Sequence, residues 1–120
     1  MNAGILIVDA SLPFIESMQN YLASTGEQIT IQQAQSATDA LTFLSESSPT
    51  VCLLNDNVSN NTSIDLLSIL KKEHPSTVII MLTDHQGEDL LQYSFKPGVH
   101  FSFNKTIDLN SIKETIMRML

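Results

Sequence analysis

Short apolar runs alternate along this chain with segments in which apolar residues recur at helical spacing. Runs of four or five consecutive apolar residues predict buried strands, and they lie at Ile5–Val8, Val51–Leu54 and Val78–Leu82. Two more strands are expected at Ile29–Gln32 and Val99–Phe103, where apolar and polar residues alternate in part. The alternation at Ile29–Gln32 indicates a strand nearer the edge of the sheet.

The segments that follow the strands carry apolar residues three and four positions apart, which predicts a helix after each strand. Ser11, Ser36 and Asp108 are the candidate N-caps of the first, second and last helices. The five predicted helices cover residues 12–25, 37–44, 64–72, 88–95 and 109–119. Five strand–helix units imply right-handed crossovers and a parallel sheet covered on both faces. The predicted fold is therefore a single α/β domain over residues 1–120, a flavodoxin-like, doubly wound (βα)5 sheet.

Composition narrows the function classes. The 120 residues are 42% hydrophobic, with six basic residues and a net charge of −7, which argues against direct nucleic-acid binding. No basic stretch precedes Ile5–Val8 and no apolar run approaches membrane-span length, so we expect neither a signal peptide nor a membrane helix. A single cysteine, Cys52, inside a predicted buried strand fits a reducing cytoplasm.

Polar residues with distinct chemistry follow four of the predicted strands. Asp9, Asn55, Thr83 and Lys105 should meet at the carboxyl edge of the sheet, the usual ligand edge of open α/β folds. Lysine and hydroxyl groups hold phosphate oxygens, and carboxylates hold a divalent ion, so this set resembles a phosphoryl site. Residues 9–13, which follow the first strand, contain no glycine-rich turn, and this excludes dinucleotide-binding and P-loop sites.

These motifs, in this order and spacing, resemble those of a response-regulator receiver domain of the CheY-like superfamily. Ile5–Asp9 is similar to the opening strand that ends in the family's acidic pair, and Pro49–Leu67 to the segment that carries the phospho-accepting aspartate. Val78–Thr83 resembles the strand that ends in the family's Ser/Thr, and Gly98–Leu109 the segment that carries its lysine. The resemblance covers essentially the whole chain and implies a bacterial, cytoplasmic module of a two-component or phosphorelay pathway.

Several positions depart from the family pattern. Asn55 stands at the phospho-acceptor position, and Ala10 replaces the second acid of the pair, which is a direct metal ligand in the family. Ser102 occupies the position of the switch aromatic, and Thr106 that of the proline after the lysine. The loop at residues 59–63 lacks the usual proline and glycine. Of the family's site residues, only Asp9, Thr83 and Lys105 remain.

The departures predict a pseudo-receiver that does not use aspartyl phosphorylation. An intact pocket has three carboxylates against one lysine, a net charge of about −2 that suits Mg²⁺. In this chain Asp9 and Lys105 give the pocket a net charge of about zero, so we expect weak or no Mg²⁺ binding and no metal site. We also expect no other cofactor and no enzymatic activity. A carboxamide is a poor nucleophile, so Asn55 cannot form an acyl phosphate. We expect Lys105 to be held by Asp9 and by the carbonyl oxygen of Asn55.

Output is then expected through protein contacts, either with a partner or in a homodimer. The family uses the surface of the last two helices with the fifth strand for this purpose. Ser102 has no ring to flip, and alternation should place Phe101 and Phe103 on the opposite face of the sheet.

Three other interpretations stay open from the sequence. Asp56 is an alternative acceptor if the third strand contains a bulge; with regular pleating it points away from Lys105 and is a loop or surface carboxylate. Asp9, Thr83 and Lys105 could be structural remnants in which Lys105 neutralises Asp9 and Thr83 satisfies loop amides. The uncharged pocket could also bind a small ligand.

Overall fold

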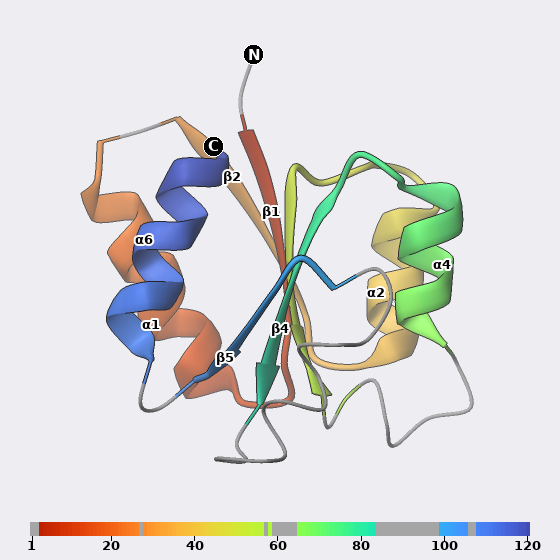
Figure 1. Cartoon of the computed structure of the whole chain (residues 1–120), viewed down its shortest axis with the longest axis horizontal. Coiled ribbons are helices and arrows are strands. Elements are labelled where there is room, and N and C mark those ends of the chain that lie inside the picture. Colours follow the sequence, from red (N-terminus) through yellow and green to blue (C-terminus); the bar gives the residue numbers. More distant parts are fainter. Residues whose placement is uncertain (1–2, 27, 57, 59–64, 84–98, 106–107) are drawn as a thin grey trace.

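Five parallel strands form one sheet, with helices on both of its faces (Figure 1). The computed structural model describes residues 3–26, 28–56, 58, 65–83, 99–105 and 108–120. The strands are β1 (Ala3–Val8), β2 (Ile29–Ala34), β3 (Val51–Asn55), β4 (Val78–Thr83) and β5 (Phe101–Asn104). The helices are α1 (Leu12–Ser24), α2 (Ala37–Leu44), α4 (Leu66–Glu73) and α6 (Leu109–Met119).

The strand order is β2-β1-β3-β4-β5, and every neighbouring pair is parallel. The predicted flavodoxin-like fold is therefore confirmed. β2 lies at one edge, as its alternating pattern predicted, and β5 lies at the other. This order brings the carboxyl ends of β1, β3, β4 and β5 together, as the site prediction requires.

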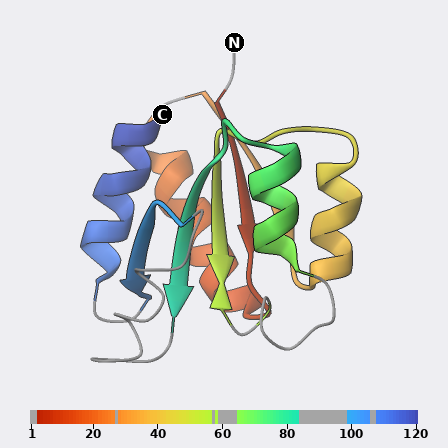
Figure 2. The same ribbon diagram turned by 45° about the vertical axis from the view of Figure 1, so that its right-hand side comes forward.

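Two apolar clusters fill the space between the sheet and its helices. One contains Leu6, Cys52, Leu54 and Met81 with residues of α2 and α4. The other contains Ile7, Leu53 and Leu82 with residues of α1 and α6. Figure 2 shows these two pairs of helices on opposite sides of the sheet. The side chains of neighbouring residues in a strand thus point to opposite faces of the sheet, as the pleat requires.

Local signals in the sequence explain where the helices begin. The Ser11 side chain accepts a hydrogen bond from the Phe14 amide at the start of α1, and Ser36 accepts one from the Asp39 amide at the start of α2. Asp65 caps α4 in the same way. These side chains satisfy backbone donors that the first turn of a helix leaves without an intrahelical partner.

The structure corrects two details of the predicted pattern. The fifth strand begins at Phe101 rather than at Val99. The His100 amide donates to the Ile79 carbonyl, but the Ile79 amide donates to the His100 ring instead of to a backbone carbonyl. Asp108 precedes α6, but its carboxylate accepts from the Asn104 amide instead of capping the helix. The predicted helix at residues 88–95 and Ile64 lie outside the described residues.

Within the part of the chain that the structure describes, no helix is long and apolar enough to span a membrane.

Cys52 is fully buried in β3, as predicted, and burial raises the pKa of its thiol from 9.0 to about 12. The unfolded chain releases this proton near pH 9.0 while the folded chain keeps it until about pH 12, so the folded state binds more protons in this window. We expect the free energy of unfolding to fall by up to ~1.4 kcal/mol per pH unit above about pH 9 from this residue alone.

Urea titrations of the wild type and of Cys52→Ala at several alkaline pH values test this expectation. The difference in stability between the two proteins should shrink as the pH rises, because the variant lacks the thiol. Two parallel curves of stability against pH would contradict it.

Candidate functional site

Four polar residues lie at the carboxyl ends of neighbouring strands, as the sequence predicts. Asp9 follows β1, Asn55 ends β3, Thr83 ends β4 and Lys105 follows β5. Asp9 and Asn55 are each 2% exposed and Thr83 is fully buried, so the group lies under the surface of this edge.

The backbone fixes the two charged members of this group. The Asp9 amide donates to the Ala34 carbonyl at 3.0 Å, which extends the β1–β2 ladder by one residue. The Lys105 amide donates to the Thr83 carbonyl, also at 3.0 Å, and extends the β4–β5 ladder in the same way. Both side chains therefore start from well-defined positions just beyond the sheet.

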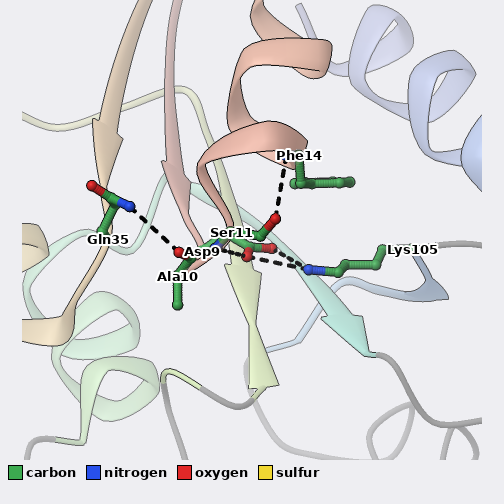
Figure 3. Close-up of polar contacts among 6 residues, drawn as sticks. All are labelled: Asp9, Ala10, Ser11, Phe14, Gln35 and Lys105. Atoms are coloured by element: carbon green, nitrogen blue, oxygen red, sulfur yellow. Dashed lines mark hydrogen bonds and ion pairs between the residues drawn. The ribbon is translucent and has the colours of Figure 1, made fainter.

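Asp9 and Lys105 form an ion pair across the sheet edge (Figure 3). The Lys105 Nζ atom lies 2.9 Å from Asp9 Oδ2 and 3.2 Å from Oδ1. The Ser11 amide donates a further hydrogen bond to Oδ1 at 2.8 Å, so both carboxylate oxygens accept hydrogen bonds. A charge-assisted bond of this length is about twice as strong as a neutral one. The predicted contact of Lys105 with Asp9 is present, and its predicted contact with Asn55 stays a prediction.

Asp56 differs from its expected place on the surface. Its side chain is fully buried, and its Oδ2 atom accepts a hydrogen bond from the Thr83 hydroxyl at 3.2 Å. The backbone leaves the extended conformation at Asp56, one residue beyond β3, so the chain turns the carboxylate inward. The expectation of a surface carboxylate is therefore wrong, because strand alternation stops where the strand does.

The polar edge is divided between the two faces of the sheet. Met81 belongs to the apolar cluster that faces α2 and α4, and Thr83, two residues later in the same strand, points to the same face. Its hydrogen-bond partner Asp56 therefore lies on that side as well. Lys105 instead reaches the α1 side, where its Nζ atom lies 4.8 Å from the centroid of the Phe14 ring.

The family's metal-ligand and switch positions hold small side chains. Ala10 is exposed and its side chain has no atom that could bind a metal; its backbone carbonyl accepts a hydrogen bond from the Gln35 amide group at 3.4 Å. Ser102 pairs in register with Met81, and among the described residues its hydroxyl has no hydrogen-bond partner. Phe101 and Phe103 pack into the cluster of α1 and α6 and stack on each other with centroids 6.4 Å apart, on the opposite face as predicted.

Phe14 makes a contact at this site that the sequence interpretation missed, since the helical pattern marked it only as an apolar core position. Its place in the first turn of α1, directly after the strand that carries Asp9, was the available signal. The loop at 59–63 and Thr106 lie outside the described residues.

Over the residues that the structure describes, no group of three or more His, Cys, Asp or Glu side chains lies close enough to hold a metal ion.

A five-stranded parallel sheet with an acid, a hydroxyl and a lysine at its carboxyl edge defines a signalling receiver fold. The family model for the response regulator receiver domain matches residues 5–117. The chain therefore belongs to this family of two-component signalling domains. A comparison with curated proteins gives no match.

Solved structures share the fold at low sequence identity. A response regulator from Thermotoga maritima is 20% identical with a TM-score of 0.81, and the alignment covers 99% of this chain and 98% of that one. The Vibrio cholerae chemotaxis protein CheY4 is 20% identical with a TM-score of 0.80 over all of both chains. The Thermotoga maritima response regulator TrrA, solved in complex with Mg²⁺–BeF, is 20% identical with a TM-score of 0.76, covering 98% and 99%.

The Asp9–Lys105 pair makes a testable contribution to stability. The Asp9 side chain is 3% exposed and that of Lys105 is 14% exposed, so removal of the lysine leaves a buried carboxylate without its counter-charge. Lys105→Met should lower the free energy of unfolding by about 3 kcal/mol. The double variant Asp9→Asn/Lys105→Met should lose at least ~1 kcal/mol less than the two single changes added together.

Urea unfolding of the four proteins measures this coupling. Lys113→Met is the matched control, because Lys113 lies over the Tyr21 ring on the same face of the molecule, and its loss should cost less than about 1 kcal/mol. Strict additivity of the Asp9 and Lys105 changes would show that the pair is not coupled.

Proposed function

We propose that this receiver domain works without aspartyl phosphorylation and transmits its signal through protein contacts. The observation that carries the proposal is the residue at the tip of β3: Asn55, 2% exposed, stands beside strands whose ends hold an already formed Asp9–Lys105 ion pair. We place this activity in a two-component or related pathway of the bacterial cytoplasm and assign the domain no catalysis of its own.

The chemistry of Asn55 supports the first half of the proposal. Aspartyl phosphorylation needs a carboxylate oxygen that attacks phosphorus and keeps it as an acyl phosphate. The amide of Asn55 is neutral and nucleophilically weak. The site therefore lacks both the negative charge and the nucleophile that an aspartate would supply at this position.

The donor set does not suit Mg²⁺ either. This ion requires near-octahedral oxygen ligands, commonly one or two carboxylates together with phosphate and water. Both oxygens of Asp9 already accept from Lys105 and Ser11, and Ala10 offers no side-chain ligand. The Lys105 ammonium, 2.9 Å from Asp9 Oδ2, repels a second cation that approaches this carboxylate. We therefore expect Mg²⁺ to bind weakly or not at all.

Asp56 supports a second candidate, a phosphorylatable receiver with a shifted acceptor. Its hydrogen bond to Thr83 places a hydroxyl beside a carboxylate, as a phosphoryl site needs. Three features favour the first proposal: Asp56 is fully buried, Thr83 faces α2 and α4, and Lys105 lies on the α1 side with Asp9. With Asp56 included, the edge has two carboxylates against one ammonium, more charge than the sequence-based count of zero.

The output side of the domain supports the second half of the proposal. A receiver that couples its site to its surface by an aromatic flip needs a ring at position 102, and this chain has Ser102 there. Phe101 and Phe103 are stacked in the opposite core and cannot replace that ring. We infer that β5 and α6 form a constitutive docking surface for a protein partner or a second copy.

Incubation with Mg²⁺ and either acetyl phosphate or beryllofluoride tests phosphorylation directly. We expect no mass gain and no large change in the amide NMR spectrum, because Asn55 offers no acceptor oxygen. Asn55→Asp and Asp56→Asn variants separate the two candidate functions under the same conditions.

A stoichiometric mass gain in the wild type that is lost in Asp56→Asn would establish the shifted acceptor and refute the proposal. A gain that survives in Asp56→Asn would refute both.

Site-specific photo-crosslinking tests the docking surface. A crosslinking residue at Asn110 or Arg118, both exposed on α6, should give defined adducts with a partner or a second copy. The same residue at Lys72, exposed on α4 on the other side of the sheet, is the matched control. Equal adducts at Lys72 and on α6 would contradict this assignment.

A further inference from the structure

Lys105 has a second neighbour besides Asp9. The Phe14 ring lies 4.8 Å from the Lys105 Nζ atom, close enough for a cation–π interaction (Figure 3). The Lys105 side chain is only 14% exposed, so its contacts with the ring and the carboxylate lie largely out of reach of water.

The position of this ring is fixed by the same short segment that fixes the carboxylate. The Ser11 amide donates to Asp9 Oδ1 at 2.8 Å, and the Ser11 hydroxyl accepts from the Phe14 amide at 3.3 Å. Phe14 also packs against the apolar cluster of α1 and α6. The N-cap of α1 therefore links the two groups that contact Lys105: the Asp9 carboxylate accepts from Ser11, and Ser11 in turn accepts from the backbone of Phe14.

The ring disfavours one specific kind of ligand. An aromatic face carries a negative quadrupole, which attracts the ammonium and repels an anion that approaches from the same side. An oxyanion that uses Lys105 must draw the ammonium away from Asp9 and from the ring. The cation–π interaction alone is worth ~0.5–2 kcal/mol, a factor of about 2 to 30 in anion affinity.

We propose that Phe14 is a positioning residue that holds Lys105 on Asp9 and keeps this lysine from serving an oxyanion. The inference rests on the proposed function, in which the Asp9–Lys105 pair fills the site without metal or phosphoryl group. It adds that the missing carboxylates are not the only reason for the loss of phosphoryl chemistry. The substitutions Ala10→Asp and Asn55→Asp would restore the negative charge, but Phe14 would still hold Lys105 on Asp9.

The chain supplies a matched control on the same helix. Lys113 of α6 lies 4.3 Å from the centroid of the Tyr21 ring of α1, a similar cation–π pair away from the strand ends. Phe14→Leu and Tyr21→Leu each remove one aromatic face and keep an apolar side chain. A general effect on α1 would appear in both variants, and an effect on Lys105 only in the first.

The first experiment reads the contact itself in the wild-type background, by NMR of the lysine side chains. The ring should shift the Lys105 ε-methylene and ammonium signals upfield. In Phe14→Leu these signals should move toward ordinary lysine values and the ammonium protons should exchange faster with water, while Tyr21→Leu should move only the Lys113 signals. Unchanged Lys105 shifts and exchange rates in Phe14→Leu would overturn the proposal.

The second experiment measures anion affinity with Mg²⁺ and beryllofluoride, followed by fluorine NMR. The Ala10→Asp/Asn55→Asp protein should bind more tightly by a factor of about 2 to 30 once Phe14→Leu is added, whereas Tyr21→Leu should leave its affinity unchanged. Equal affinity with and without Phe14→Leu, including no binding by either protein, would overturn the proposal. Binding by the wild-type chain would refute the proposed function but would leave this comparison intact.

Discussion

The ion pair between Asp9 and Lys105 is the interaction on which the rest of the site depends. It joins the end of β1 to the end of β5 across the strand ends between them, and it uses both oxygens of the only acid left from the family's pair. A buried ion pair often contributes little net stability, because desolvation offsets much of the attraction, but loss of one partner is costly. Each member of the pair is therefore hard to replace without a loss of stability.

The sheet pleat separates the remaining polar groups by face. Asp9 and Lys105 meet on the α1 side, while Thr83 faces α2 and α4 and donates to Asp56. A phosphoryl group needs lysine, hydroxyl and acceptor around one point. Here the lysine forms an ion pair with one acid, and the hydroxyl donates a hydrogen bond to another acid on the other face of the sheet. This division, together with the neutral amide of Asn55 at the end of β3, supports the proposal that the domain works without phosphorylation.

The fold could be predicted from the sequence because its signals are local and repeated. Apolar runs, helical spacing and N-cap residues such as Ser11 and Ser36 each specify one element, and five strand–helix units leave few topologies. The meeting of Asp9 with Lys105 followed from topology alone. The burial of Asp56 could not be predicted, because it depends on where β3 stops and the backbone turns. The Phe14 contact was missed for a related reason, since a helical pattern assigns a ring to the core without specifying what lies above its face.

The central claim is that Lys105, rather than a metal ion, neutralises Asp9. A titration of the wild-type protein with Mg²⁺, followed through the amide NMR signals of Asp9 and Ser11, tests it most directly. The account predicts that both signals stay in place up to millimolar Mg²⁺. Saturable shifts of both signals at submillimolar Mg²⁺, with release of the Lys105 ammonium, would contradict it.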